Sequence, residues 1–240
     1  LVSRTKIIYT EHGNFAFGRK ATIKDKVNQA LRKMFYTFAV DTVICNSNFT
    51  RDYLLNSWKI PECKLTVVHN GTDLSLVPNS QVVKKIRDLY KGNFIVGSIN
   101  RLASVKKVER LINTFMDYLP TNPDAVLLIV GDGPERNNLE KLAGSKLDKN
   151  IFFLGFKSNP SDYQAAFDLA VFPSQNESFG LVAIETYNSG TPVVVFSDGG
   201  GLAEIVGMFN PSDVVADRAS LIRRMSHYSC NDNNNNNYDS

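Results

Sequence analysis

Short continuous apolar runs alternate with amphipathic stretches over most of the chain. A run of about 4 to 8 apolar residues indicates a buried strand, whereas apolar positions three or four apart indicate a helix. Strands are expected at 5–10, 42–46, 64–68, 94–99, 126–130, 151–154, 168–172 and 192–196. Helices are expected at 20–39, 48–57, 105–118, 135–143, 160–167 and 179–189. This alternation is typical of βα units around a parallel sheet, so an α/β protein with two doubly wound units is expected.

Turn-forming residues between Asn70 and Ser80 mark the expected seam between the two units. Residues 76–225 contain five expected strands, enough for a complete Rossmann-like domain. Residues 1–75 contain three, so the first unit is expected to be an incomplete Rossmann-like part that lacks the front of its sheet. Residues 226–240 include five consecutive Asn residues, and we expect the polar segment from Cys230 to Ser240 to be disordered.

Composition narrows the class of protein. The chain has 240 residues, of which 43% are hydrophobic and 21% charged, and no apolar run approaches the roughly 20 residues that span a bilayer. Its three cysteines form neither a CxxC motif nor a His/Cys cluster, so a disulfide framework and a zinc site are not expected. We therefore expect a cytoplasmic location. The amino terminus lacks a signal-peptide pattern, and the chain is expected to be an internal piece of a longer protein.

The charge is unevenly distributed. Residues 1–75 contain 11 Lys and Arg against 6 Asp and Glu, whereas residues 76–240 contain 16 against 18. The basic first part favours a phosphate-bearing or membrane-surface partner. No dense basic stripe with interleaved aromatic residues occurs, so a nucleic-acid partner is not expected.

Two carboxylates lie eight residues apart where the strand 168–172 leads into the next helix. Glu177 lies in the loop at the carboxyl end of the strand, where ligands of open α/β sheets bind, and Glu185 lies two turns into the helix. Ionised carboxylates accept strong hydrogen bonds from sugar or ribose hydroxyls. The alternative is structural: Glu177 would favour the helix start electrostatically and Glu185 would be solvated.

Two cations, Arg101 and Lys106, follow the strand 94–99. Arg offers a planar fork for phosphate oxygens and Lys a point charge, so together they would neutralise charge on a departing nucleoside diphosphate. The alternative is that Lys106 and Lys107 are ordinary charged residues in the first turn of a helix. Positive charge at a helix start opposes the helix dipole, which favours the functional interpretation.

Two glycine-rich turns and one histidine are weaker signals. Gly199, Gly200 and Gly201 follow the strand 192–196 and would let backbone approach a ligand, while the Val130–Pro134 turn is interpreted as mostly structural. His12 ends the first expected strand and is either a structural hydrogen-bonding group or part of a site. Because no Asp-x-Asp and no Gly-x-x-x-x-Gly-Lys occurs, no metal and no other cofactor is expected.

Taken together, these motifs resemble the retaining GT-B glycosyltransferases of the glycosyl transferases group 1, also called family 4. The resemblance covers about residues 5 to 210 and follows the order of motifs in the family. The matching segments are 43–47, 67–73, Arg101 with Lys106, 130–134, 151–156, the Glu177 and Glu185 pair, and the Gly199-Gly200 turn with Glu204 and Ile205.

The resemblance implies that the second domain holds a nucleotide-diphospho-sugar. Glu185 would bind the ribose and Glu177 the hydroxyls of the transferred sugar, while His12 would approach the sugar from the first domain. In a front-face retaining mechanism the leaving diphosphate assists the acceptor hydroxyl, so no separate protein base is required. Backbone groups would hold the diphosphate together with Arg101 and Lys106, namely those of Phe179, Gly180, Leu181 and Val182.

Two departures from the family pattern bear on function. The family's first strand and Gly-rich loop have no counterpart here, and Lys107 stands where Gly usually follows the Lys. The expected function is sugar transfer from a nucleotide-diphospho-sugar to a glycan or lipid-linked acceptor. One alternative is a catalytically silent or split donor-binding half that needs a partner chain to complete its first domain. A sugar-nucleotide epimerase is a further alternative that Arg101, Lys106 and the Glu pair disfavour.

Residues 19–38 combine an apolar stripe with basic residues. Ile23, Val27, Leu31, Phe35 and Phe38 recur at near-helical spacing, and Arg19, Lys20, Lys24, Lys26, Arg32 and Lys33 occupy the other faces. This pattern predicts a peripheral helix on an anionic membrane surface, at the inner face of a membrane. The alternative is an ordinary domain helix whose apolar stripe faces its own sheet.

Overall fold

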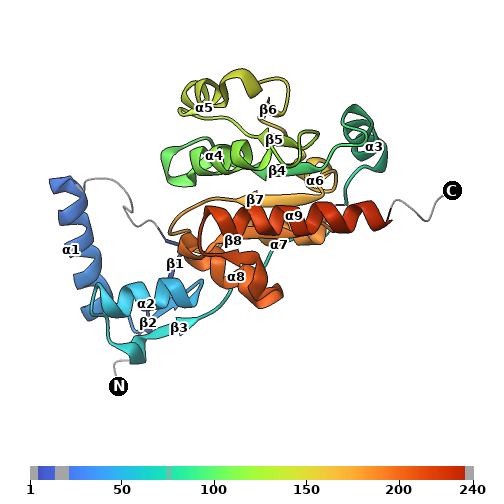
Figure 1. Cartoon of the computed structure of the whole chain (residues 1–240). Helices are drawn as coiled ribbons and strands as arrows, with labels where there is room; N and C mark the ends of the chain where they lie inside the picture. The colour runs from blue at the N-terminus through green and yellow to red at the C-terminus, as the bar shows by residue number, and fades with distance from the viewer. Residues whose placement is uncertain (1–4, 14–21, 74, 76, 236–240) are drawn as a thin grey trace.

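The computed structural model describes residues 5–13, 22–73, 75 and 77–235, which form two α/β units (Figure 1). The first unit comprises β1 (Ile8–Glu11), α1 (Ile23–Phe38), β2 (Thr42–Cys45), α2 (Asn48–Asn56) and β3 (Leu65–Val67). The second comprises α3 (Ser80–Leu89), β4 (Ile95–Ile99), α4 (Val108–Tyr118), β5 (Val126–Val130), α5 (Arg136–Ala143), β6 (Ile151–Gly155), α6 (Pro160–Gln164), β7 (Leu169–Phe172), α7 (Leu181–Asn188), β8 (Val193–Phe196), α8 (Gly201–Phe209), β9 (Val214–Val215) and α9 (Arg218–Asn235).

Both sheets are parallel throughout. The first has the order β1-β2-β3, and the second has the order β6-β5-β4-β7-β8-β9. In the second sheet the chain proceeds outward from β4 to β6 and then returns to the other side of β4 with β7. The strand order therefore reverses between β4 and β7, and such a switch point is where doubly wound sheets bind their ligands.

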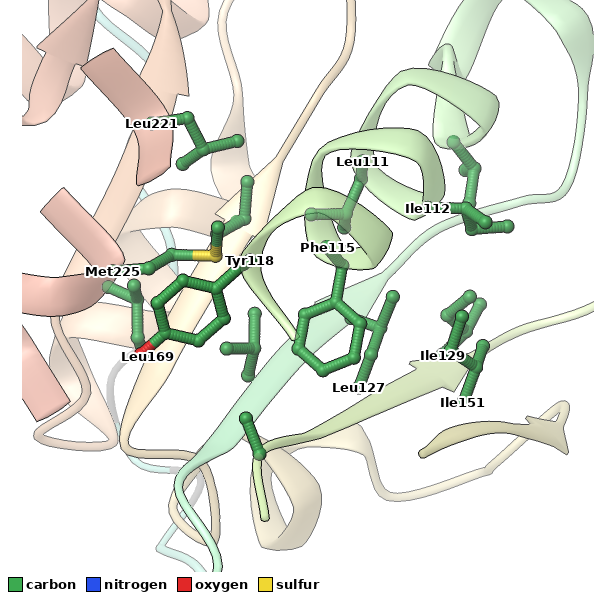
Figure 2. Close-up of a cluster of buried hydrophobic side chains, with 14 of the residues drawn as sticks. Leu111, Ile112, Phe115, Tyr118, Leu127, Ile129, Ile151, Leu169, Leu221 and Met225 are labelled. Atoms are coloured by element: carbon green, nitrogen blue, oxygen red, sulfur yellow. The ribbon is translucent and has the colours of Figure 1, made fainter. Parts of the chain in front are cut away.

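Alternate residues of each central strand enter two separate cores. Leu127 and Ile129 of β5 pack on the side of α4 and α9, while Val126 and Leu128 pack on the side of α7 and α8. Figure 2 shows the first of these cores, in which Phe115 of α4 lies against Leu127. Because both faces of a parallel sheet are covered by helices, its strands are continuous apolar runs, which is why the sequence located them.

The expected strands are all confirmed, but the second sheet has six strands rather than five. The sixth, β9, has only two residues, which is too short for a periodic pattern. The helices α3, α8 and α9 were not predicted. The expected helix 105–118 is interrupted, because Ser104–Lys106 forms a 3-10 turn and Lys107 adopts a left-handed backbone with φ of 53° before α4 begins. Glycine adopts that conformation most easily, so the Gly that usually stands at this position in the family suits the left-handed backbone better than Lys107 does.

The prediction of a disordered tail from Cys230 is wrong for its first part. The helix α9 continues through Asn235, while residues 236–240 lie outside the described part of the chain. The helix is anchored further upstream, where Leu221 and Met225 are fully buried against the sheet and α4 and Tyr228 packs on the same core. A short anchored segment thus extends helix into residues whose composition alone predicted disorder.

Most of the apolar stripe of α1 is exposed rather than packed on its own sheet, although the Phe35 ring contacts Tyr9 of β1. Ile23, Val27 and Phe38 have exposed fractions of 84%, 51% and 76%. The side chain that enters the core instead is Tyr36, whose hydroxyl donates to the buried carboxylate of Glu11 at 2.6 Å. Burial, reinforced by this bond, raises the pKa of Tyr36 well above its usual range. Arg32 forms an ion pair with the same carboxylate.

Candidate functional site

The switch point of the second sheet brings the two strongest sequence signals together. β4 and β7 are neighbours in register, with Val96 opposite Leu169. Arg101 follows the carboxyl end of β4 and Glu177 follows the carboxyl end of β7. The loops that follow β4 and β7 therefore meet at one edge of the sheet, where Lys106 contacts Glu177, 71 positions later in the sequence.

An ion pair joins the two loops. The Lys106 Nζ donates to both carboxylate oxygens of Glu177, each at 2.8 Å. About a quarter of each side chain is exposed, so the pair lies at the surface and a ligand has access to it. The sequence assigned Lys106 to a diphosphate and Glu177 to sugar hydroxyls, and the structure places these two side chains in direct contact.

Two other predicted residues have unused polar groups. The Arg101 side chain is exposed and makes no hydrogen bond or ion pair within the described part of the chain. The Glu185 carboxylate, half-buried on α7, likewise has no partner among those residues. A partly buried carboxylate such as that of Glu185 normally acquires a partner, and the exposed guanidinium of Arg101 is accessible from solvent, so both groups are open to a ligand.

The helix α7 begins at Leu181, two residues later than predicted. Phe179 is 2% exposed and packs inward, and Gly180 precedes the helix in a left-handed conformation with φ of 103°. No side chain caps this helix start. The first N–H groups of any helix have no acceptor within the helix, so those of Leu181 and Val182 are suited to an anion.

The Gly199-Gly200 turn is joined to the loop that contains Glu177 by backbone hydrogen bonds. The Glu177 N–H donates to the Gly199 carbonyl at 3.0 Å, and the Gly201 N–H donates to the Glu177 carbonyl at 2.7 Å. A Cβ at Gly200 would lie 2.7 Å from that carbonyl oxygen and 2.9 Å from the Phe49 ring. The glycines thus let the loop and α2 approach closely, and their contact with a nucleotide remains a prediction.

His12 reaches the same region from the first unit. Its side chain is exposed at the carboxyl end of β1, and its carbonyl accepts from Asn46 Nδ2 at 3.4 Å. The adjacent Gly13 approaches so closely that a Cβ there would lie 2.3 Å from Cβ of Ser178. The residue next to His12 thus contacts the loop that contains Glu177. The role of His12 toward a sugar stays a prediction.

Sequence reasoning overlooked the role of Glu204 at this junction. Its carboxylate accepts from the N–H groups of Asn48 and Phe49, at 3.1 and 3.0 Å, and lies 3.1 Å from Nε2 of His69. Burial raises the pKa of Glu204, but these hydrogen bonds outweigh it and leave the pKa below its ordinary value. A lowered pKa means that ionised Glu204 stabilises the fold above the ordinary Glu range, and that this stabilisation disappears as the pH falls through the lowered value.

Other parts of the fold have fewer features of a binding or catalytic site. A cavity of about 760 Å³ lies at the amino ends of β4, β5 and β7, lined by residues such as Arg87, Asp124 and Ser229, at the edge of the sheet opposite the Glu177 loop. Within the described ranges, no three His, Cys, Asp or Glu side chains gather as a metal-ligand set would. None of the helices described is long and apolar enough to cross a membrane.

Comparison with known proteins agrees with this geometry. The chain is 26% identical over 198 residues to the O-antigen biosynthesis glycosyltransferase WclY of Escherichia coli, covering 80% of this chain and 54% of that one. It is 25% identical to a UDP-Gal:alpha-D-GlcNAc-diphosphoundecaprenol alpha-1,3-galactosyltransferase of the same species, covering 79% and 51%. The crystal structure of Anabaena Alr3699/HepE with UDP and glucose superposes with a TM-score of 0.66 at 21% identity, covering 93% and 67%.

The two parallel sheets and the similarity to solved structures define a GT-B fold with two Rossmann-like units. The family model for glycosyl transferases group 1 matches residues 79–227, and that for glycosyltransferase family 4 matches residues 1–76. The chain belongs to the glycosyl transferases group 1 family, as its motifs indicated. It spans about half the length of the two curated relatives above.

Proposed function

We propose that this chain is the donor-binding part of a retaining glycosyltransferase that uses a nucleotide-diphospho-sugar in glycan or glycolipid synthesis. The observation that supports this most directly is the Lys106–Glu177 pair at the switch point. Arg101 follows the same strand, β4, and has no hydrogen-bond or ion-pair partner among the described residues. We assign the phosphates to Arg101 and Lys106 and the sugar hydroxyls to Glu177, since these groups suit those partners chemically. The names of the relatives, with a UDP-Gal donor and a lipid-linked acceptor in one and bound UDP in another, favour the same substrates.

The residues divide the work of transfer between phosphate and sugar. The bond from the anomeric carbon to the diphosphate breaks, a bond to the acceptor oxygen forms on the same face, and the acceptor proton passes to the leaving diphosphate. Arg101, Lys106 and the first N–H groups of α7 neutralise the negative charge that develops on the diphosphate. Glu177 holds the sugar hydroxyls, Glu185 the ribose, and His12 approaches the sugar from the first unit. No metal is required in this scheme.

A binding screen tests this function on the chain itself. We expect at least one of UDP, GDP and ADP to bind by calorimetry or NMR, and to shift the amide signals of residues 101–107 and 177–182. Adenosine, which lacks the diphosphate, is the matched control and should bind far more weakly. Failure of all three diphosphates to bind at millimolar concentration would exclude the proposal.

A second candidate function is a donor-binding half that acts only with a partner polypeptide. β1 is an edge strand, and Ile7 and Ile8 beside that edge are 43% and 63% exposed. An edge strand with exposed apolar residues is a ready template for another strand. The partner would add a parallel strand to β1 and complete the first sheet. Sugar transfer or donor hydrolysis by the purified chain alone would contradict this candidate.

The exposed stripe of α1 supports contact with an anionic membrane that holds the acceptor. Lys26 and Lys33 are exposed on the same helix, and each lysine near anionic lipid contributes on the order of 1 kcal/mol. We expect sedimentation with phosphatidylglycerol vesicles but not with phosphatidylcholine vesicles, reversed by high salt. Replacing both lysines by Glu should abolish it, whereas Lys84→Glu with Lys85→Glu, on α3, should not. Absence of binding at low salt would favour a soluble acceptor.

A further inference from the structure

Glu204 ties the second unit to the amino terminus of α2 in the first unit. In addition to the two backbone bonds, Asn48 Nδ2 donates to Glu204 Oε1 at 2.8 Å. Both carboxylate oxygens are thus engaged by α2, although Glu204 lies in the first turn of α8, more than 150 residues away in sequence. Only 16% of the Glu204 side chain is exposed, which strengthens charge-assisted bonds of this kind.

The same turn of α2 contacts the loop that contains Glu177. Ser47 Oγ, at the cap of α2, donates to the Ser178 carbonyl at 2.6 Å, and Thr50 Oγ1 lies 3.4 Å from that oxygen. The Phe179 ring lies 5.9 Å from the His69 imidazole, centroid to centroid. The loop 177–180 is therefore held by hydrogen bonds from the first unit on one side and by the Gly199–Gly201 turn on the other.

These contacts form one chain of interactions from α8 through α2 to the donor loop. If Glu204 released α2, the Ser47 hydroxyl would no longer be held over the Ser178 carbonyl. The neighbouring Glu177 and the start of α7 would then lose support from the first unit. None of the atoms of Glu204 needs to touch a ligand for this effect to occur.

We propose that Glu204 is a positioning residue, which holds the first unit against the donor loop so that Glu177 and the amino terminus of α7 are pre-organised for a nucleotide-diphospho-sugar. The inference rests on the proposed function for the identity of the ligand. Coupling of this kind is reciprocal, so nucleotide binding should in turn strengthen the contact between α2 and α8.

The test compares Glu204→Gln with Glu140→Gln at a temperature where both variants are folded. The first keeps the side-chain shape but places an amide N–H group among backbone donors, while Glu140 is an ion-paired residue on the surface of α5, remote from the junction. We expect Glu204→Gln to weaken nucleoside-diphosphate affinity by roughly fivefold or more, within the usual range of coupling between sites. Glu140→Gln should leave the affinity unchanged.

Hydrogen exchange supplies a second measurement that needs no ligand. Glu204→Gln should accelerate amide exchange at residues 48–50 and also at 177–182, whereas Glu140→Gln should affect neither segment. In a double-mutant cycle with Ser47→Ala, the effects on 177–182 should be clearly less than additive, because both variants interrupt one chain of contacts.

Two outcomes would overturn the proposal. One is a Glu204→Gln protein with lower thermal stability but unchanged nucleotide affinity and unchanged exchange at 177–182, which indicates a purely structural role. The other is faster exchange confined to residues 48–50. If the unaltered chain bound no nucleotide at all, the proposed function would fail, yet the exchange measurement would still decide whether Glu204 positions the loop.

Discussion

Replacing Glu177 by Ala is expected to weaken binding of a nucleotide-sugar by about 10- to 100-fold while the affinity for the bare nucleoside diphosphate does not fall. Hydrogen bonds between a carboxylate and hydroxyl donors contribute about 1.5–3 kcal/mol, and about 1.4 kcal/mol corresponds to a tenfold change. Glu177 also holds Lys106 Nζ with both oxygens, so its removal releases a cation toward the diphosphate. Turnover, measured as sugar transfer or donor hydrolysis, should fall more than nucleotide affinity.

Glu109 provides the matched control for this variant. It is an acidic residue in the first turn of α4 whose carboxylate lies 3.8 Å from Lys107 Nζ, but its side chain is 45% exposed. Glu109→Ala should leave both affinities unchanged, because an exposed pair of this geometry contributes little. A Glu177→Ala protein that binds nucleotide-sugar and nucleoside diphosphate with equally reduced affinity would contradict the assignment of Glu177 to the sugar.

Replacing Arg101 by Ala is expected to weaken nucleoside-diphosphate affinity by about 1–3 kcal/mol, the usual cost of leaving a hydrogen-bonding partner unsatisfied. The guanidinium is exposed and has no partner within the described ranges, so its removal breaks no hydrogen bond or ion pair there. Its loss should therefore appear in calorimetric affinity and not in the free energy of unfolding. Arg101→Lys should recover part of the affinity, since Lys keeps the charge but not the planar fork.

Arg223 is a suitable control for Arg101. It is exposed on α9, and its guanidinium contacts the hydroxyl of Ser220 on the same helix. Arg223→Ala should leave nucleotide affinity within experimental error. The division of roles would be refuted if Arg101→Ala and Glu177→Ala reduced nucleoside-diphosphate affinity equally.

The eight expected strands were predictable because each is a short apolar run that can be recognised without knowing which strand it pairs with, whereas the two-residue β9 was too short. β5, at Val126–Val130, was located to the residue. Helices were harder where glycine or polar residues obscured the pattern. α8 begins with Gly201 and was interpreted as a turn, while α9 extends into an Asn-rich segment. In both cases burial of a few apolar side chains, such as Leu202 and Leu221, outweighs weak local helix propensity.

The residues of the candidate site also fall into those that the sequence indicated and those that it did not. Arg101, Lys106 and Glu177 were found from residue type and from their place after a strand, which are local properties. The importance of Glu204 was not found, because its partners at Asn48 and Phe49 lie more than 150 residues earlier in the chain. Ser47 precedes the predicted helix 48–57, but nothing local connects its hydroxyl to the Ser178 carbonyl.

By itself, the sequence determined the α/β class, the order of the expected strands along the chain and the family, and it singled out candidate residues for phosphate and sugar. These properties follow from the local periodicity of the sequence and from the chemical type of its residues, and both can be recognised in short contiguous segments. Only the tertiary structure decided that β4 and β7 are neighbours, that Lys106 binds Glu177, that the stripe of α1 faces outward, and that Glu204 caps α2. Each of these is a pairing between distant segments, and it is selected by the packing of whole sheets and helices rather than by any local preference.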